Sequence, residues 1–286
     1  MLRTSIAHPV LDAIGDGWVL AIVGALLVAP ASFEEIVSGL GIPRSTLSNR
    51  LRHMQAHDLL EKGAREDRLY ALSSKGRDLI VLLRMVEQWD SVWATPRSAA
   101  MSVAAPNACG HHAPILLGCA HCSGKVHAQG MKILMTRRNL PAADLPTIRR
   151  ARVLEKDEER HVVSAQRLIA DRWTGMISAA AFLGTRKYSD FLQALGIGPN
   201  VLAGRLERML QDGVMERVRY SDTSDRQEYR LTERGLATYP IVVALLAWGH
   251  KWIDPEDDPG WAVLHKNCVE WFEPVFVCAE CEAPAL

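Results

Sequence analysis

The chain has 286 residues, of which 48% are hydrophobic, and its 33 basic residues balance its 33 acidic ones. This composition excludes a disordered chain and is sufficient for one or two hydrophobic cores. Because the net charge is zero, binding to a polyanion would have to come from local basic patches. The longest apolar run, Trp18 to Pro30, is too short to span a bilayer, and the N-terminus lacks a signal-peptide pattern. We therefore expect a soluble, cytoplasmic protein without a membrane partner.

The first half of the chain opens with helical patterns. Val10 to Ile14 leads into a nearly all-apolar helix from Trp18 to Val28, which Pro30 ends. Ser32 and Glu35 then form a capping box that starts a helix ending at Gly41.

A second helix follows the Gly41 turn and begins at Pro43. It carries Leu47, Leu51 and Met54 at helical spacing, which predicts one buried stripe. Two helices joined by a short turn containing glycine predict a helix-turn-helix.

Two short extended segments come next, Leu59 to Lys62 and Arg68 to Ser73, and they predict a hairpin. A polar turn then leads to a long helix from Leu79 to Trp93. Helices, a hairpin and a terminal helix in this order predict a winged helix-turn-helix.

The same pattern returns later in the chain. Short motifs recur at a constant offset of 155 positions: Asp16-Gly17-Trp18 as Asp171-Arg172-Trp173, Leu40-Gly41-Ile42 as Leu195-Gly196-Ile197, and Arg50-Leu51 as Arg205-Leu206. From Tyr229, which repeats Tyr70, the offset is 159. The change of offset places four extra residues between Glu216 and Tyr229, which we expect in an exposed loop.

The repeat predicts two domains of one fold. We assign residues 1–122 to the first winged helix-turn-helix domain, 123–155 to a linker and 156–286 to the second domain, with a cysteine cluster at the C-terminal end of each domain. The hairpin of the second domain is expected over Val214 to Tyr220 and Arg226 to Thr232, and its last helix over Leu236 to Trp252. The predicted fold class is mainly α with small β-hairpins (α+β), built from two tandem winged helix-turn-helix domains.

At these residues the chain resembles the HxlR-type family of bacterial winged-helix transcription regulators. The resemblance rests on residues 169–173, 195–206 and 228–235, and more loosely on residues 14–18 and 40–51. It implies sequence-specific binding to double-stranded DNA and control of transcription, commonly as a dimer formed through terminal helices. Many members carry a cysteine shortly before the first helix, whereas this chain has His8-Pro9 and His161-Val162 there.

The resemblance also bears on assembly, because family members usually have one such domain per chain. The tandem therefore resembles a dimer fused into one polypeptide, an internal pseudo-dimer. A homodimer of whole chains is the alternative.

The recognition helix must bury one side and offer the other to the major groove. With the Leu47 stripe inward, the outward set of the first half is Arg44, Ser45, Ser48, Asn49 and Arg52. The corresponding set of the second half is Asn200, Ala203, Gly204, Glu207 and Arg208, which is less basic. The hairpins add Arg65, Arg68, Arg217, Arg219 and Arg226 as candidate phosphate contacts. A solvated face is the alternative interpretation for the helix residues. For the wing arginines, the alternative is a surface ion pair with Glu66, Asp67, Asp222 or Asp225.

Two further repeated features are better explained by structure than by ligand binding. Arg50 and Arg205 each precede an inward leucine, which favours a salt bridge over base reading. The tryptophans are expected in the core or at an interface rather than in a ligand cage: Trp18, Trp173, Trp89, Trp93, Trp248 and Trp252.

All six cysteines lie in two repeated clusters. In the second half, His265, Cys268, Cys278 and Cys281 have the spacing of a tetrahedral zinc knuckle. In the first half, Cys109, Cys119 and Cys122 lack that histidine, and the fourth ligand would have to be His111, His112 or His121. Within-half sites of this kind would hold between one and two structural zinc ions per chain. Reduced, packed thiols or a Cys-x2-Cys redox pair are the alternatives.

Two functions from different classes are consistent with this sequence. The first is a DNA-binding transcription regulator. The second is a protein-interaction or scaffold module whose winged helices have degenerated, which Glu207 on the second face favours. A third function, an enzyme that uses the Cys/His clusters, has no acid-base or nucleophile signature to support it beyond those clusters.

Overall fold

The computed structural model describes residues 7–61, 69–93, 103–135, 171–221, 224–253 and 261–285. Several expectations fall on residues outside these ranges. They concern Lys62, Arg65, Arg68, the linker from residue 136 onward, and residues 156–170 at the start of the predicted second domain, which include His161.

The first helix-turn-helix has the predicted elements. Helices α1 (Ala7–Ile14) and α2 (Gly17–Val28) are followed by the short strand β1 (Ala31–Ser32) and by α3 (Phe33–Leu40) and α4 (Arg44–Ala56). The Ser32–Glu35 capping box is present, because Oγ of Ser32 accepts from the Glu35 N–H at 3.3 Å and Oε2 of Glu35 accepts from the Ser32 N–H at 2.7 Å. Gly41 ends α3 with φ 63°, a left-handed conformation that favours glycine.

The described part of the first wing has few strand residues, and residues 62–68, between its two sides, lie outside the described ranges. Strand β2 (Leu69–Tyr70) pairs with β1, and a single bridge joins Leu60 to Leu72. The expected polar turn contains a short helix, α5 (Ser74–Arg77). Ser73 caps this helix, because its Oγ accepts from the Gly76 N–H at 3.2 Å. The long helix α6 (Ile80–Trp93) follows, as predicted.

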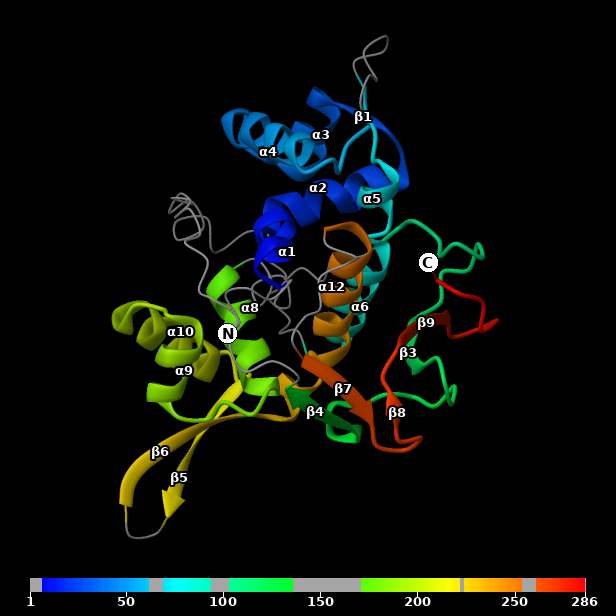
Figure 1. Cartoon of the computed structure of the whole chain (residues 1–286). Helices are drawn as coiled ribbons and strands as arrows, with labels where there is room; N and C mark the ends of the chain where they lie inside the picture. The colour runs from blue at the N-terminus through cyan, green and yellow to red at the C-terminus, as the bar shows by residue number, and fades with distance from the viewer. Residues whose placement is uncertain are drawn as a thin grey trace.

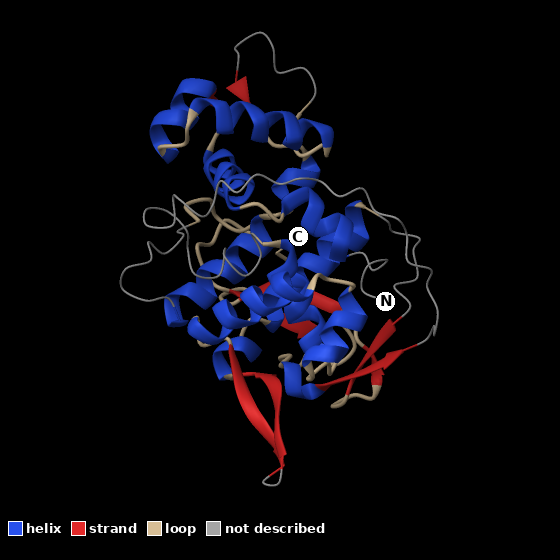
Figure 2. Cartoon of the chain, turned by 90° about the vertical axis from the view of Figure 1, so that its left-hand side faces the viewer, coloured by secondary structure: helices blue, strands red, loops and turns tan. Residues whose placement is uncertain are grey.

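The second half repeats this order with a longer wing. Its helices are α8 (Arg172–Phe182), α9 (Tyr188–Leu195), α10 (Pro199–Gln211), α11 (Glu233–Leu236) and α12 (Tyr239–Trp252). Strands β5 (Met215–Ser221) and β6 (Ser224–Leu231) form an antiparallel hairpin between α10 and α11. The four extra residues of this half therefore lie in the wing, as expected from the change of offset, and Figure 2 shows the hairpin projecting from the body. The fold class is mainly α with small β-hairpins, with two tandem winged helix-turn-helix domains.

The two halves pack through their long helices. Helix α6 lies beside α12 at the centre of the molecule, and α1 packs against α8 and α12 (Figure 1). Buried residues of both halves, such as Leu83 and Leu245, belong to one continuous hydrophobic cluster. The helix pairs α3–α4 and α9–α10 lie at opposite ends of this core.

Two tryptophans make matching contacts between the halves. The Trp89 Nε1 donates to the Arg234 carbonyl at 3.1 Å, and the Trp248 Nε1 donates to the Lys75 carbonyl at 2.9 Å. Trp89 and Trp248 are equivalent positions of the repeat, as are Lys75 and Arg234. Arg234 and Lys75 each accept through the backbone carbonyl, and their cationic side chains also lie over the rings of the same tryptophans, at 5.1 Å for Arg234 and 5.6 Å for Lys75. The expectation that these tryptophans are core or interface residues is confirmed.

A β-structured region follows α6 and α12. Strand β3 (Ile115–Cys119) pairs antiparallel with β9 (Pro274–Cys278), and the repeat-equivalent residues Leu117 and Phe276 face each other at the middle of the ladder. Ile115 lies opposite Cys278, and Cys119 lies opposite Pro274. Equivalent strands of the two halves therefore pair with each other about the centre of the ladder.

A second sheet changes the expected linker. After the short 3-10 turn η2 (Ala128–Gly130), β4 (Met131–Met135) pairs with β7 (Trp261–His265), which also pairs with β8 (Glu270–Trp271). Residues 131–135 were expected in the linker because they have no counterpart in the repeat. They form a strand because an unpaired edge of the second half is available to them.

The tertiary structure contains no membrane-spanning candidate in its described part, since none of those helices combines sufficient length with sufficient hydrophobicity.

Candidate nucleic-acid interface and cysteine clusters

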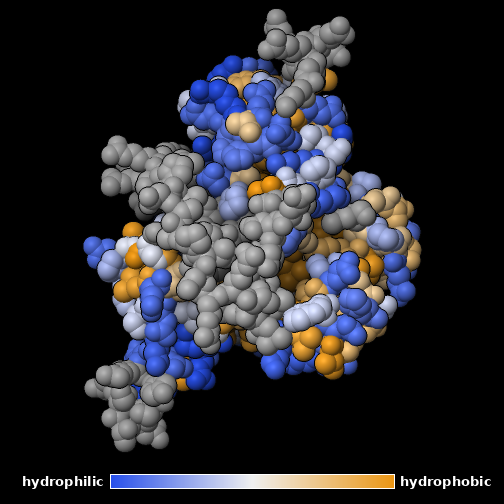
Figure 3. Space-filling model, in the orientation of Figure 1, coloured by the Kyte–Doolittle hydropathy of each residue, from blue (hydrophilic) through white to orange (hydrophobic). Residues whose placement is uncertain are grey.

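Helix α4 has the two faces that a recognition helix requires. Leu47, Leu51 and Met54 are buried against α2 and the rest of the core. The opposite face is exposed and carries the predicted residues Arg44, Ser45, Ser48, Asn49 and Arg52. Figure 3 shows a mainly hydrophilic surface on this end of the molecule. The structure therefore brings all five predicted residues to one exposed surface.

The two arginines of this face have different surroundings. Arg44 forms a two-pronged ion pair with Glu34, with both N···O distances at 2.6 Å, and lies over the Phe33 ring. Its hydrogen bonds lower the pKa of the Glu34 carboxyl. Arg52 instead donates to the side chain of Asn49 and to the Ser48 carbonyl. Because the Arg44–Glu34 pair is exposed, opening it costs little free energy.

The outer face of α10 differs from that of α4. Leu202, Leu206 and Met209 are buried, whereas Asn200 and Arg208 are exposed. Arg217 of the wing donates to Glu207 of α10 at 2.7 Å and lies over the Tyr229 ring. Its partner is a carboxylate of the recognition helix, whereas the sequence pointed to the wing carboxylates Glu66, Asp67, Asp222 or Asp225, whose side chains lie outside the described part of the structure.

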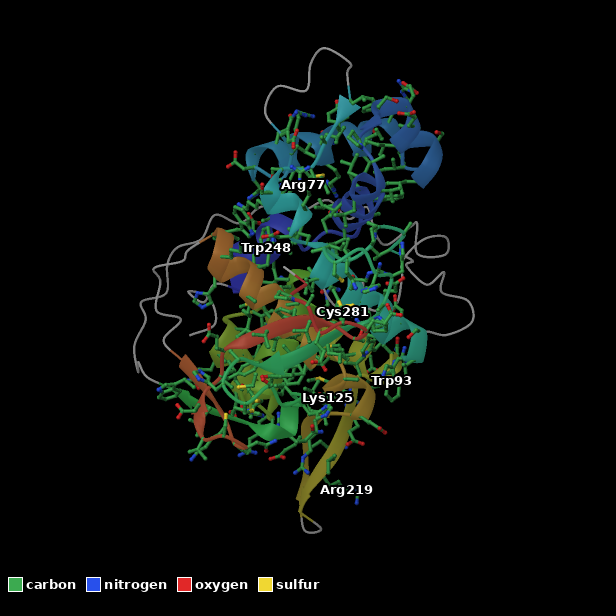
Figure 4. All side chains as sticks on the ribbon, turned by 90° about the vertical axis from the view of Figure 1, so that its right-hand side faces the viewer. Arg77, Trp93, Lys125, Arg219, Trp248 and Cys281 are labelled. Atoms are coloured by element: carbon green, nitrogen blue, oxygen red, sulfur yellow. The ribbon has the colours of Figure 1, made fainter. Side chains whose placement is uncertain are left out.

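The remaining wing arginines are placed only in part. Arg219 is exposed on β5, toward the end of the wing (Figure 4). Arg226 lies in β6, but its side chain, like all of Arg65 and Arg68, lies outside the described parts. DNA contact by this whole set stays a prediction.

Arg50 and Arg205 form the expected salt bridges. Arg50 donates to Asp16 at 2.7 Å, and Arg205 pairs with Asp171. Each aspartate also caps the following helix, Asp16 by accepting from the Trp18 N–H and Asp171 from the Thr174 N–H. These arginines thus tie each recognition helix to the helix beneath it.

The cysteines form two clusters, each of three thiols and one imidazole. Cluster A contains Cys109, His111, Cys278 and Cys281, and cluster B contains Cys119, Cys122, His265 and Cys268. Within each cluster, all four ligand atoms lie within 4.8 Å of one another. Both could hold a metal ion.

The expected grouping of these ligands within each half is wrong. Each cluster takes one Cys-x2-Cys pair from one half and a Cys/His pair from the other. The cause is the antiparallel pairing of β3 with β9, which places Cys278 opposite Ile115 and carries each Cys-x2-Cys turn toward the other half. Of the three histidines considered for the first half, His111 joins a cluster, whereas His112 and His121 are not among its ligands.

The Cys-x2-Cys turns have the same backbone in both halves. Ser123 donates its N–H to the Cys119 carbonyl at 2.8 Å, and the equivalent Glu282 donates to the Cys278 carbonyl at 2.9 Å. Both residues adopt positive φ, 54° and 57°. This backbone points amide groups at the first sulfur of each turn.

These amides affect thiol ionisation. Hydrogen bonds from the backbone N–H groups of Cys281 and Glu280 lower the pKa of Cys278 to about 6. Burial raises the pKa of Cys119, but hydrogen bonds from the backbone of His121 and Cys122 outweigh it, so the net direction is downward. The first thiol of each turn is thus stabilised as a thiolate, the form that ligates metals.

The two cluster histidines differ in the surroundings of their rings. His111 lies with Nε2 3.7 Å from a Glu280 carboxylate oxygen, and its Nδ1 faces the Cys109 sulfur at 3.5 Å. His265 is 1% exposed, and its Nδ1 lies 3.4 Å from the Cys122 sulfur.

Sequence reasoning missed the cross-half ligand sets. A usable signal was present, since β3 and β9 are equivalent segments of a repeat, and equivalent strands can pair about a two-fold axis.

A helix-turn-helix followed by a wing and a long helix, present twice with an exposed polar face on each second helix, defines a winged helix-turn-helix protein of the transcription-regulator class. The model of the family described as HxlR-like helix-turn-helix matches residues 13–98 and 168–257, which together exceed half of the chain. The chain belongs to this family.

The chain is also similar to individual proteins. An HTH-type transcriptional regulator of Mycobacterium tuberculosis is 34% identical over 124 residues, covering 43% of this chain and 78% of the relative. The HTH-type transcriptional regulator YodB of Bacillus subtilis is 28% identical over 95 residues, covering 33% of this chain and 85% of YodB. The structure of the reduced form of YodB matches 33% of this chain and 93% of its own with a TM-score of 0.30.

Proposed function

We propose that this protein is a sequence-specific DNA-binding transcription regulator, built as a fused pseudo-dimer of two winged-helix domains. Helices α4 and α10 are its two recognition helices, and double-stranded DNA in the cytoplasm is its partner. The reciprocal contacts of Trp89 with Arg234 and of Trp248 with Lys75 are the observation that carries the proposal.

Reciprocity is the property that supports a dimer-like arrangement. In a two-fold interface, a residue of one unit contacts a second position of its partner, and the reverse contact also exists. The tryptophan contacts have this form, and so does the β3–β9 ladder centred on Leu117 and Phe276. A two-fold arrangement of reading helices matches the two half-sites of an operator.

The two half-sites are expected to differ in sequence. The α4 face offers Arg44, Asn49 and Arg52, which suit guanine and adenine edges. On α10, Arg217 neutralises Glu207, and fewer base-reading groups remain. We therefore expect an imperfect palindrome in which the α4 half-site supplies more of the specificity.

Selection of bound sequences from random DNA, followed by footprinting of the whole chain, tests the proposal. The expected result is one footprint that spans two half-sites about one helical turn apart. A footprint that covers one half-site per chain would contradict the pseudo-dimer.

The second candidate function is a protein-interaction module, favoured by the Arg217–Glu207 pair on the second face. Salt titration separates the two candidates. Phosphate contacts make the logarithm of the binding constant fall steeply with salt, whereas a scaffold would show no such DNA binding.

We propose no catalytic activity, and we propose a structural role for the metal that clusters A and B could hold. Four protein ligands complete a tetrahedral zinc shell and leave no open position for a substrate.

A further inference from the structure

We propose that clusters A and B each bind one zinc ion, and that the two ions fasten the first half of the chain to the second. Each site is composite, because it needs ligands from both halves. The zinc ions thereby hold together the arrangement in which α6 lies against α12.

The ligand atoms have the spacing of a tetrahedral zinc site. Bond lengths of about 2.3 Å to sulfur and 2.0–2.1 Å to nitrogen give tetrahedral edges of about 3.6–3.8 Å. In cluster A, Nδ1 of His111 lies 3.5 Å from the Cys109 sulfur and 3.8 Å from the Cys278 sulfur.

Cluster B has the same dimensions. Nδ1 of His265 lies 3.4 Å from the Cys122 sulfur and 3.3 Å from that of Cys268, and the Cys119 and Cys268 sulfurs are 3.9 Å apart. That separation is far above a disulfide bond of about 2.05 Å. All six cysteines are free thiols.

The three thiols of cluster A are the repeat equivalents of the three thiols of cluster B. Cys109 corresponds to Cys268, and Cys278 and Cys281 correspond to Cys119 and Cys122. Only the imidazole departs from this relation, since His111 follows its neighbouring cysteine and His265 precedes it. Each half therefore contributes ligands to both sites, and the two sites lie at opposite ends of the β3–β9 ladder.

The sites are connected to the helical core. Arg84 of α6 donates to the Ala105 carbonyl, four residues before Cys109, and its neighbour Glu87 accepts from the Val103 N–H at 3.0 Å. The β3–β9 ladder then joins this segment to the second half. Zinc binding therefore favours one position of α4 relative to α10. That this position matters for DNA reading rests on the proposed function.

The decisive experiment counts zinc in pairs of double variants of the full chain, purified under reducing conditions. The wild type should hold two zinc ions. Cys109→Ser combined with Cys281→Ser removes two ligands of one composite site, so one zinc should remain. Cys109→Ser combined with Cys122→Ser damages both sites, so no tightly held zinc should remain. Sites confined to each half would give the reverse result for the two double variants.

Histidine variants extend the test. The pair of His111→Ala and Cys281→Ser separates composite sites from sites within each half, whereas the pair of two histidine variants damages both sites in either case. His111→Ala with Cys281→Ser should keep one zinc, and His111→Ala with His265→Ala should keep none. Circular dichroism at the helix band checks that each variant is folded, and cobalt titration of the wild type provides a readout that needs no variant. Two equivalents of cobalt should give the visible absorption of a tetrahedral, thiolate-ligated ion.

Three results would overturn the proposal: folded, reduced wild type without zinc or cobalt uptake, one ion per chain, or the reversed pattern of double variants. None of these measurements involves DNA. A protein that binds two zinc ions but no operator would refute the proposed function and leave the composite sites intact.

Discussion

The indole Nε1 of Trp89 donates to the backbone carbonyl of Arg234, 145 positions along the chain, at 3.1 Å. Its repeat equivalent, Trp248, makes the mirror contact with Lys75 at 2.9 Å. Each tryptophan is at most 4% exposed. The two contacts are thus the same interaction made twice across one interface.

Replacing either tryptophan by alanine should destabilise the protein by about 3–5 kcal/mol, the usual cost of emptying a buried aromatic site. Urea denaturation measures this loss. Trp271→Ala serves as the control, because Trp271 is 53% exposed and should cost much less. A neutral Trp89→Ala beside a costly Trp248→Ala would contradict an equivalent role for the two contacts.

Gly76 and Gly235 are equivalent positions at which a side chain cannot fit. A Cβ at Gly76 would lie 2.3 Å from the Leu59 carbonyl oxygen, and one at Gly235 would lie 2.1 Å from that of Val214. We expect each Gly→Ala variant to lose about 2 kcal/mol or more, because backbone must move. Thermal unfolding measures the loss.

Gly39 provides the matched control for these variants. It lies inside α3, and a Cβ added there would meet no atom within 4 Å, so Gly39→Ala should stabilise the protein by about 0.5–1 kcal/mol. If all three variants behaved alike, the close approach at Gly76 and Gly235 would not be the cause.

Val269 holds a strained backbone beside cluster B. Its φ is 61°, whereas the equivalent residue next to Cys109 is Gly110, with φ 86°. A β-branched residue in this region is costly, and asparagine tolerates it. Val269→Asn should therefore stabilise the protein by about 1 kcal/mol, and Gly110→Val should destabilise it by about 1–2 kcal/mol.

The control for Val269 is Val92→Asn, at a position that is 70% exposed in helix α6. Valine and asparagine have similar helix propensity, so its stability should change little. Unfolding temperatures of the three variants, measured in the same buffer and with the same metal content, check the prediction. A destabilised Val269→Asn would show that the valine side chain is needed there.

Arg52→Ala should weaken operator binding by roughly 1–3 kcal/mol and relax sequence preference, as expected for loss of a base contact. Arg208→Ala on α10 should have a smaller effect, because its face is less suited to base reading. Fluorescence anisotropy with the selected operator and with a scrambled duplex measures both. Unchanged affinity of Arg52→Ala, or a larger effect of Arg208→Ala, would refute the assignment of α4 as the dominant reading helix.

The helix-turn-helix units could be predicted because their signals are local. Ser32 and Glu35 are three residues apart, and Gly41 stops a helix through its own conformation. The inward stripe of Leu47, Leu51 and Met54 needs only helical periodicity, and the structure buries all three. The Arg50–Asp16 salt bridge was also predictable in kind, since a charged residue beside a buried stripe needs a partner.

The cysteine sites could be predicted only as a set of residues. Seven of the eight cluster members were predictable as ligands, and His111 was one of three candidates for the eighth. The spacing of the cysteines along the chain is the same whether a Cys-x2-Cys turn shares a metal site with a Cys/His pair of its own half or with one of the other half. The strand β4 was missed for a related reason, because its partner β7 lies in the other half of the chain.

The repeat, the family, the helices of each reading unit and the residues able to ligate a metal are predictable from the amino-acid sequence, because each depends on neighbours along the chain. Which residues meet across the halves depends on long-range packing. The antiparallel register that sets Ile115 opposite Cys278 sends each Cys-x2-Cys turn to the other half's cysteine and histidine. This register forms between segments that are far apart in the chain and that the packing of α6 against α12 brings together. The spacing of residues along the chain does not encode such long-range contacts.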